Sequence, residues 1–234
     1  QLLAEQGIAA DVFSVTSWSE LARDGMACDQ RALAGLGEAG APFVAQQLAQ
    51  TLSGDLTTGA HEGDIPFGTI TTIVESPKKF GLIYAGTDDG NIQLSTDDGY
   101  TWKNLSPRLP KNLQGLYVSR VCPSMYQEGR VYVTLNGYRN DNFMPYLLVS
   151  EDYGNTWTQL GADLPAEPLN VVREDTKKED IIYVGSDNGF YASFDKGKSF
   201  MTVGSTLPRV PVHDLVIQQR DNELVIGTHG RSIY

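Results

Sequence analysis

The chain has little cysteine, no long apolar run and no excess of positive charge. Its 2 cysteines, Cys28 and Cys122, stand far apart among 234 residues, which argues against a disulfide framework and against a zinc site. No stretch of eighteen or more apolar residues occurs, so we expect no membrane span. With 18 Lys and Arg against 29 Asp and Glu, the formal net charge is −11, and this balance argues against non-specific binding to nucleic acid.

One eight-residue pattern, Ser/Thr-x-Asp-x-Gly-x-Thr/Ser-aromatic, occurs at 95–102, 150–157 and 193–200. In each copy a Leu-Pro pair begins seven residues after the aromatic residue. A register kept over fifteen positions indicates an internal repeat, and a repeat decides the fold. We call the three copies Asp boxes 1 to 3, and their defining residues are Ser95, Asp97, Gly99, Trp102, Ser150, Asp152, Gly154, Trp157, Ser193, Asp195, Gly197 and Phe200.

Short β-branched and aromatic stretches, separated by Gly, Asp, Asn and Pro, fill the chain from residue 64 onward. They predict four strands per repeat with tight turns, and a period of roughly 45 residues is typical of propeller blades. The predicted strands are 70–74, 82–86, 92–95 and 101–105, then 117–122, 130–134, 146–150 and 156–160, then 170–173, 181–185, 190–193 and 199–203, and finally 212–218 and 224–228. The prediction is a mainly β, partial β-propeller with blades at 64–110, 115–165 and 167–208 and an incomplete fourth blade at 210–234.

These repeats resemble the BNR or Asp-box repeat proteins, which include sialidases, the sortilin luminal domain and bacterial glycosyl hydrolase-like propellers. The three Asp boxes carry the resemblance, supported by the segments 83–90, 182–189, 212–215 and 227–234. It covers about residues 64–234 and implies a propeller. It implies no particular activity, because such repeats serve enzymes and binding modules alike.

Residues 1–53 differ in composition and are rich in Ala, Leu and Gln. Residues 12–16 predict a buried strand, Ser17 and Glu20 form a capping box that begins a helix, and Pro42 begins a second helical stretch. Because one strand has no partner, this α/β fragment is not a complete domain, and 54–63 is predicted to be a linker.

The segment 10–25, and more loosely 42–49, resembles the C-terminal domain of the pyruvate dehydrogenase E1 component, a thiamine-diphosphate enzyme of the transketolase type. The likeness departs at 31–40, and no thiamine-diphosphate motif is present. It therefore implies no dehydrogenase activity.

The Asp boxes invite a metal or catalytic interpretation, but a structural one is favoured. An Asp in a tight turn accepts backbone N–H groups, while Gly takes the positive φ that the turn requires. We expect the aromatic residues Trp102, Trp157 and Phe200 to pack under the next blade, and we expect neither a metal nor a cofactor.

Two arginines, Arg120 and Arg173, are predicted at equivalent positions near the end of a blade's first strand, with Arg231 as a possible third. By resemblance to sialidases, which hold a carboxylate with three arginines, they form a weak catalytic candidate. The alternative is that they pair with neighbouring carboxylates, namely Glu75, Glu174 or Asp175.

His213, followed by Asp214, is a weak candidate for a general base. No activated nucleophile accompanies the pair, and together with His229 it offers too few ligands for a metal site. A structural role is favoured for these residues.

The segment 135–145 has no counterpart in the other repeats and is predicted to be an inserted loop. Repeat insertions often carry binding. Tyr138, Arg139 and Phe143 are residue types enriched in interface hot spots, so we predict a contact surface here; the alternative is a solvated loop.

The favoured function is non-catalytic binding of a protein or glycan by blades that belong to a larger propeller. Closed propellers have about four to eight blades, so further blades or another copy would close the ring. One alternative is a sialidase-type glycoside hydrolase that uses the arginines. Another is a composite chain with a non-functional E1 fragment. The cellular compartment stays open, because the propeller resemblance favours secretion or the periplasm and the E1-like segment favours the cytoplasm.

Overall fold

A computed structural model of the protein describes residues 68–234, except for 205–206, 219 and 231–232. The chain divides into two compact units, residues 1–50 and 51–234. The predicted strand at 12–16, both predicted helices, the E1-like segment and Arg231 lie outside the described residues.

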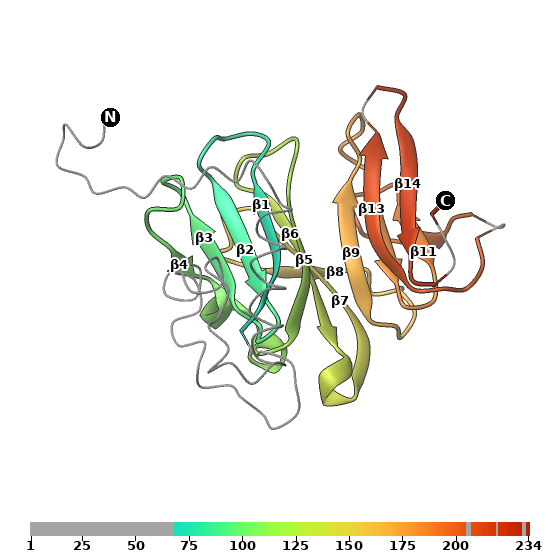
Figure 1. Ribbon diagram of the computed structural model, residues 1–234, viewed down its shortest axis with the longest axis horizontal. Helices are drawn as coiled ribbons and strands as arrows, with labels where there is room; N and C mark the ends of the chain where they lie inside the picture. Colours follow the sequence, from blue (N-terminus) through green and yellow to red (C-terminus); the bar gives the residue numbers. More distant parts are fainter. Residues whose placement is uncertain (1–67, 205–206, 219, 231–232) are drawn as a thin grey trace, which may run out of the picture. The chain divides into compact units, whose positions relative to one another are not determined.

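The described residues form three four-stranded antiparallel sheets and one two-stranded sheet, in which the strands neighbour one another in chain order. We call them blades 1 to 4 (Figure 1). Blade 1 consists of β1 (Ile70–Glu75), β2 (Ile83–Thr87), β3 (Ile92–Ser95) and β4 (Lys103–Asn104). Blade 2 consists of β5 (Tyr117–Pro123), β6 (Val131–Gly137), β7 (Asn142–Ser150) and β8 (Thr158–Leu160). Blade 3 consists of β9 (Leu169–Glu174), β10 (Ile182–Ser186), β11 (Phe190–Ser193) and β12 (Met201–Thr202). Blade 4 consists of β13 (Val212–Gln218) and β14 (Glu223–Thr228).

Short 3-10 helices complete the described part of the chain. They are η3 (Ser106–Arg108) and η4 (Lys111–Leu113) after blade 1, and η5 (Tyr138–Asn140) between β6 and β7. No helix among the described residues is long and apolar enough to cross a membrane. The predicted fold class, a mainly β partial propeller, is confirmed.

Each blade packs on the next through an apolar cluster. The first cluster joins blades 1 and 2 around Tyr84, Leu105 and Val121, which are almost entirely buried. The second joins blades 2 and 3, and the third joins blades 3 and 4. Removing apolar surface from water stabilises a fold by about 25 cal/mol per Å². In this protein, that stabilisation arises at the junctions between blades.

The first strand of every blade carries one β-bulge at the same place in the repeat. The pairing registers skip Thr71, Ser119, Asn170 and His213. A bulge leaves one residue unpaired and turns its side chain out of the ladder. The four bulges therefore give a common reference point, from which the residues of the four first strands, here called the inner strands, can be matched one to one.

Two of the bulge side chains join one blade to the next. The Thr71 hydroxyl donates to the carbonyl of Val118 at 2.6 Å, and the Ser119 hydroxyl donates to the carbonyl of Leu169 at 2.7 Å. Both acceptors are the residue before the next blade's bulge. The inner strands are thus connected by a repeating hydrogen bond as well as by the apolar clusters.

Candidate functional site

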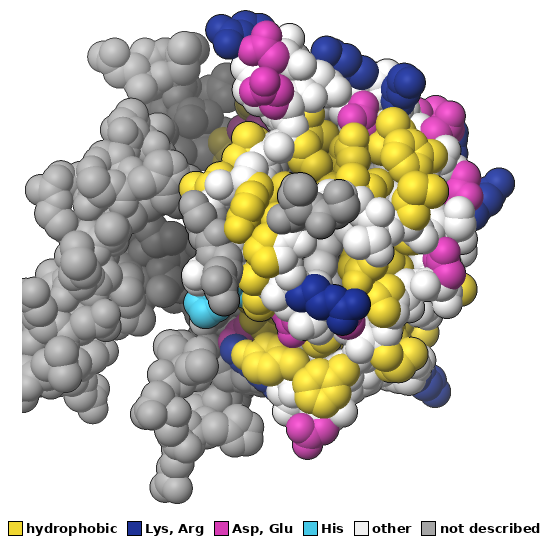
Figure 2. Space-filling view, turned by 90° about the vertical axis from the view of Figure 1, so that its right-hand side faces the viewer, with side chains coloured by type: hydrophobic (Ala, Val, Ile, Leu, Met, Phe, Trp, Pro, Cys, Tyr) yellow, Lys and Arg dark blue, Asp and Glu magenta, His cyan; other side chains and the backbone are white. Residues whose placement is uncertain are grey.

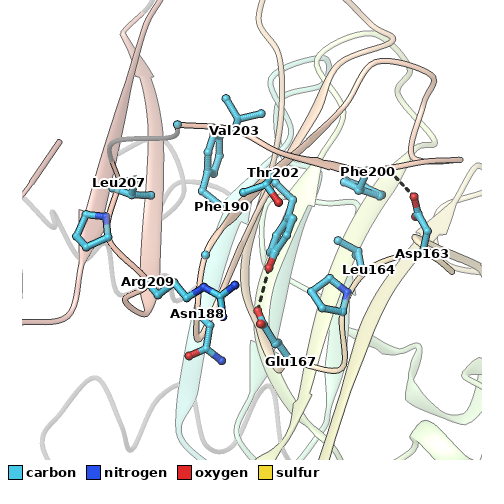
Figure 3. Close-up of a pocket in the computed structure, with 15 residues that line it drawn as sticks. Asp163, Leu164, Glu167, Asn188, Phe190, Phe200, Thr202, Val203, Leu207 and Arg209 are labelled. Carbon is cyan, nitrogen blue, oxygen red and sulfur yellow. Dashed lines mark hydrogen bonds between the residues drawn. The ribbon is translucent and has the colours of Figure 1, made fainter.

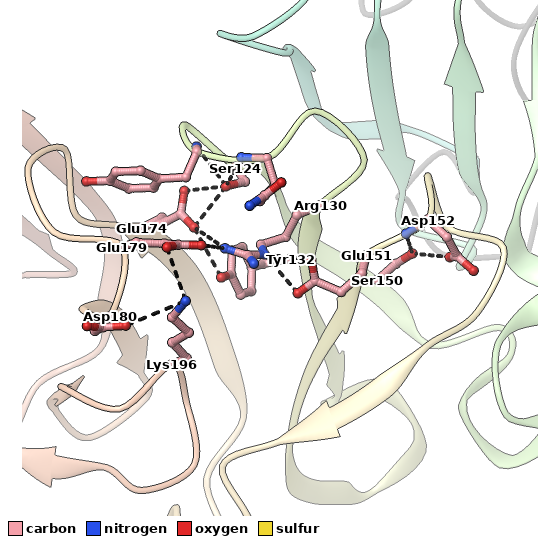
Figure 4. Close-up of polar contacts among 12 residues, drawn as sticks. Ser124, Arg130, Tyr132, Ser150, Glu151, Asp152, Glu174, Glu179, Asp180 and Lys196 are labelled. Carbon is pink, nitrogen blue, oxygen red and sulfur yellow. Dashed lines mark hydrogen bonds and ion pairs between the residues drawn. The ribbon is translucent and has the colours of Figure 1, made fainter.

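The Asp boxes close small hydrogen-bond networks at the turn after the third strand. In box 2, Ser150 Oγ donates to Asp152 Oδ1 at 2.8 Å and accepts the Gly154 N–H at 2.8 Å. Asp152 also accepts the N–H and the hydroxyl of Thr156, both at 2.8 Å. The same four bonds recur in boxes 1 and 3. Figure 4 includes the Ser150–Asp152 pair. Both carboxylate oxygens of each box Asp are therefore engaged by its own turn.

These bonds favour the charged carboxylates. Hydrogen bonds from Ser199 and Ser193 lower the pKa of Asp195 to about 2, and similar bonds lower the pKa values of Asp97 and Asp152. An unfolded Asp has a pKa of about 3.9. The stability that Asp195 contributes is therefore fully present above about pH 4 and is lost as the pH falls through about 2.

We expect Asp195→Asn to flatten the acid limb of the stability profile. Urea unfolding measured from pH 5 to pH 2 should show a steeper loss of stability for the wild-type chain than for this variant. Asp98→Asn is the control, because Asp98 is an exposed box residue outside the four-bond network, and it should keep the wild-type slope. Equal slopes for all three proteins would contradict the prediction.

The aromatic residues of boxes 2 and 3 pack on the preceding blade, so the expectation of packing under the next blade is wrong. Trp157 of blade 2 joins the cluster shared with blade 1, and Phe200 of blade 3 joins the cluster shared with blade 2. Trp102 donates its indole N–H to the carbonyl of Gly99 in its own box at 3.0 Å.

The two candidate arginines meet at one carboxylate on β13. Asp214 Oδ1 lies 3.0 Å from Arg120 Nη2 and 3.2 Å from Arg173 Nη2. Arg120 also donates to the carbonyl of His213 at 3.1 Å, and Arg173 donates to the carbonyl of Leu215 at 2.7 Å. Desolvation by burial and the nearby Arg173 lower the pKa of Arg120. The predicted pairing with a carboxylate is present, but the partner is Asp214 and not Glu75, Glu174 or Asp175.

The two arginines do not occupy equivalent positions, contrary to the sequence prediction. Counted from the bulges, Arg120 follows Ser119 directly, whereas Arg173 stands three residues after Asn170. The sequence prediction compared the two strands without this shared reference point, and it therefore aligned Arg120 with the wrong residue of β9.

The neighbouring histidines contact each other. The rings of His213 and His229 lie 5.5 Å apart, edge to face. The carboxylate of Asp214 is engaged by the two guanidinium groups and by the N–H of Leu215 at 2.9 Å. In the part of the chain that the structure describes, no group of three His, Cys, Asp or Glu side chains is placed to hold a metal ion.

The segment 135–145 is mostly strand, so its prediction as a loop is wrong. β6 continues to Gly137 and β7 begins at Asn142, with η5 between them. The insertion lengthens a hairpin: after a register shift beyond the Leu135–Tyr146 pair, the pairing resumes with Gly137 opposite Asn142. The result is a projecting β6–β7 hairpin (Figure 1).

Arg139 fastens the tip of this hairpin to blade 1. Its Nη1 lies 3.0 Å from Oδ2 of the buried Asp88, whose Oδ1 accepts the N–H groups of Gly68 and Thr69. The guanidinium also lies over the ring of Tyr117, 5.3 Å from its centroid. A partly buried, charge-assisted contact of this kind fixes geometry well.

Three apolar side chains stand exposed around this fixed tip. Tyr138 is 46%, Phe143 53% and Met144 52% exposed. The hairpin thus brings together all three predicted binding residues, with Arg139 holding the tip and Tyr138 and Phe143 facing solvent. Met144 was missed, although its place directly after Phe143 was a visible signal.

A groove of about 500 Å³ lies beside blade 3. Among its lining residues are Glu167, Phe190, Tyr191, Val203 and Leu207. The Tyr191 hydroxyl donates to Glu167 at 3.1 Å, and Figure 3 shows Glu167 and Phe190 among the residues that line the groove. Sequence reasoning missed the groove, because its residues come from separate turns and strands.

Comparisons with known proteins agree with the propeller fold. No protein-family model matches the chain. A xyloglucanase from Hypocrea jecorina (strain QM6a) is 28% identical over 152 residues, which cover 59% of this chain and 18% of that protein. An ancestral GH74 enzyme superposes with a TM-score of 0.55 at 15% identity, over 71% of this chain and 22% of that one. The protein YCF48 bound to D1 peptide superposes with a TM-score of 0.51 at 15% identity, over 71% of this chain and 51% of that one. The chain thus spans about a fifth of the length of the xyloglucanase and of the GH74 enzyme, and the likeness to the solved structures shows the fold alone.

Proposed function

We propose that the blades form a non-catalytic binding module within a larger propeller, and that the β6–β7 hairpin is its contact surface for a protein. The observation that carries the proposal is the exposed set Tyr138, Phe143 and Met144 on a tip that the Arg139–Asp88 ion pair holds in place. Aromatic and Met side chains are enriched in the buried centre of interfaces. A surface fixed before binding loses less entropy when the partner arrives.

We further propose that the Asp boxes serve the fold and not a reaction. Each box carboxylate is occupied by bonds within its own turn. Both oxygens of each carboxylate thus accept hydrogen bonds that shape the turn, which supports a structural role. YCF48 bound to D1 peptide offers a precedent for peptide binding among propellers of related fold, and a glycan remains the second ligand class to be tested.

The binding proposal is tested by selecting a phage-displayed library of random linear peptides on the immobilised chain. We expect enriched peptides whose affinity falls at least tenfold, about 1.4 kcal/mol, in the double variant Phe143→Ser and Met144→Ser. Tyr100→Ser is the matched control, because Tyr100 is 66% exposed on blade 1, and it should bind like the wild type.

Two results would overturn this proposal. One is the absence of enrichment, and the other is equal binding by the double variant. A glycan array offers the remaining alternative: binding of an oligosaccharide that is lost in the same double variant would replace the protein ligand by a glycan.

One observation favours a second candidate function, glycoside hydrolysis. The xyloglucanase is a relative found by sequence, and glycosidases act with a pair of carboxylic acids. On the inner strands, Asp214 already pairs with Arg120 and Arg173. The two candidate arginines thus have a partner within the chain, and this favours the binding function. We expect no release of reducing sugar from xyloglucan and no turnover of fluorogenic sialosides. Turnover that the double variant Arg120→Ala and Arg173→Ala abolishes would establish the enzyme instead.

A further inference from the structure

The position two residues after each bulge faces the preceding blade. At this position, Val121, Val172 and Leu215 are 1%, 0% and 0% exposed, and each lies in the cluster shared with the blade before it. The equivalent residue in blade 1 is Ile73, which is 50% exposed. Blade 1 therefore presents, uncovered, the face that the other three blades bury.

The opposite face of a blade behaves in the complementary way. Tyr84 of blade 1 and Tyr132 of blade 2 contact the following blade and are 0% and 2% exposed. Val225 is the equivalent residue of β14, since it pairs with Val216 as Tyr84 pairs with Val74. Val225 is 39% and Val216 52% exposed. Figure 2 looks toward the side of the molecule formed by blades 3 and 4 and shows hydrophobic side chains across much of it, with one Lys or Arg group near the centre and most other charged groups toward the rim.

Glycines on the second strands form seats for the next blade. A Cβ on Gly86 would lie 2.4 Å from Val118 Cγ1, and a Cβ on Gly185 would lie 2.6 Å from Val212 Cγ1. Both valines lie in the first strand of the following blade, one residue before its bulge. At Gly227 of blade 4, the nearest atoms all belong to Asp214 of the same blade. Gly227 stands at the same position as Gly86 and Gly185, opposite the residue that follows a bulge. It therefore leaves room for a branched side chain from another blade.

The residue equivalent to those two valines in blade 1 is Ile70, which is also β-branched and stands one residue before the bulge at Thr71. Blade 4 also has a side chain that could donate the inter-blade hydrogen bond. His213 is the exposed bulge residue of blade 4, and an imidazole N–H can donate to a carbonyl as the hydroxyls of Thr71 and Ser119 do.

We propose that two copies of this chain associate head to tail, with β1 of one copy packed against blade 4 of the other. Ile70 would fill the seat at Gly227, and Ile73 would cover Val216 and Val225. Both halves of the junction are present on one chain: the apolar contact recurs at all three junctions already in the fold, and the glycine seat recurs at two of them. Two copies together carry eight first strands, within the about four to eight blades of closed propellers, and head-to-tail contacts that close give rings. This inference rests on the repeat geometry and not on the proposed ligand binding.

The association is tested by light scattering coupled to size-exclusion chromatography of the full chain. We expect a particle of twice the 25.6 kDa chain mass. Ile73→Asp alone and Val216→Asp alone should each give the single-chain mass, because each places a charge in both junctions of the ring. Phe194→Asp is the control, since Phe194 is 55% exposed in Asp box 3, and it should leave the dimer intact. Circular dichroism should show the same β content for all variants.

Mixing the two single variants distinguishes this geometry from a face-to-face dimer. A mixed pair has one junction that carries both charges and one that carries neither. The uncharged junction joins Ile73 of the Val216→Asp chain to Val216 of the Ile73→Asp chain, so the mixture should regain the dimer mass. A wild-type chain that stays at the single mass over a concentration series would overturn the proposal. So would a mixture of the variants that shows no recovery. Peptide binding at the β6–β7 hairpin should be equal in all these variants, which separates this test from that of the proposed function.

Discussion

Replacing Gly154 by alanine should lower the free energy of unfolding by about 2–5 kcal/mol. Gly154 has φ of +79°, and a Cβ there would lie 2.4 Å from Cδ1 of the fully buried Leu105 of blade 1. The left-handed backbone costs an L-residue about 1–2 kcal/mol, and overpacking a core costs about 1–3 kcal/mol more. Asp box 2 is therefore a turn and an inter-blade contact at once, because its glycine is the surface on which Leu105 packs.

The three boxes supply their own controls. Gly99 has φ of +86°, but a Cβ there would meet nothing closer than 3.8 Å, so Gly99→Ala should cost only the backbone term of about 1–2 kcal/mol. Gly197, whose Cβ would lie 2.8 Å from Leu160 Cδ1, should fall between the two. Urea unfolding at one protein concentration measures the series. Equal losses at Gly99 and Gly154 would show that packing on Leu105 contributes nothing.

The local part of the fold was predictable from the sequence. β3, β11 and β13 begin and end where the β-branched and aromatic stretches predicted, at 92–95, 190–193 and 212–218. The last strand of each of blades 1 to 3 is shorter than predicted, because the first two residues predicted for it belong to the Asp-box turn. Thr101, for example, gives its N–H to Asp97 and so cannot join the ladder of β4. Short-range patterns were reliable wherever the deciding contacts were also short-range.

The candidate site depended on contacts that sequence spacing does not contain. Arg120 and Asp214 are 94 residues apart, and only the packing of blade 4 beside blade 3 brings them within 3.0 Å. The bulge at Ser119 shifts the register by one residue, and a hydroxyl residue in a strand gives no local sign of this. The hairpin tip was recognised by composition, but its ion pair to Asp88 was not, since both partners look like ordinary turn residues.

The junction between blades 2 and 3 contains the most buried ionic group of the described residues, centred on Arg130 (Figure 4). Its side chain is 9% exposed and lies 2.8 Å from Glu151 and 2.7 Å from Glu179. Nη1 also lies 3.6 Å from Glu174, whose side chain is 1% exposed. Glu174 in turn accepts the hydroxyl of Ser124 at 2.7 Å and the hydroxyl of Tyr132 at 3.2 Å. The network is polar throughout and spans two blades.

Arg130→Ala should therefore destabilise the protein by about 3–5 kcal/mol, because it leaves the buried carboxylate of Glu174 without its cation. The matched control is Lys79→Ala, which removes a 3.0 Å ion pair with Glu128 whose side chains are 45% and 41% exposed. Exposed pairs are worth about 0–1 kcal/mol, because water and salt screen them. Urea unfolding measures both variants at neutral pH. If Arg130→Ala lost no more than Lys79→Ala, the hydrogen bonds from Ser124 and Tyr132 would suffice to hold Glu174 without the cation.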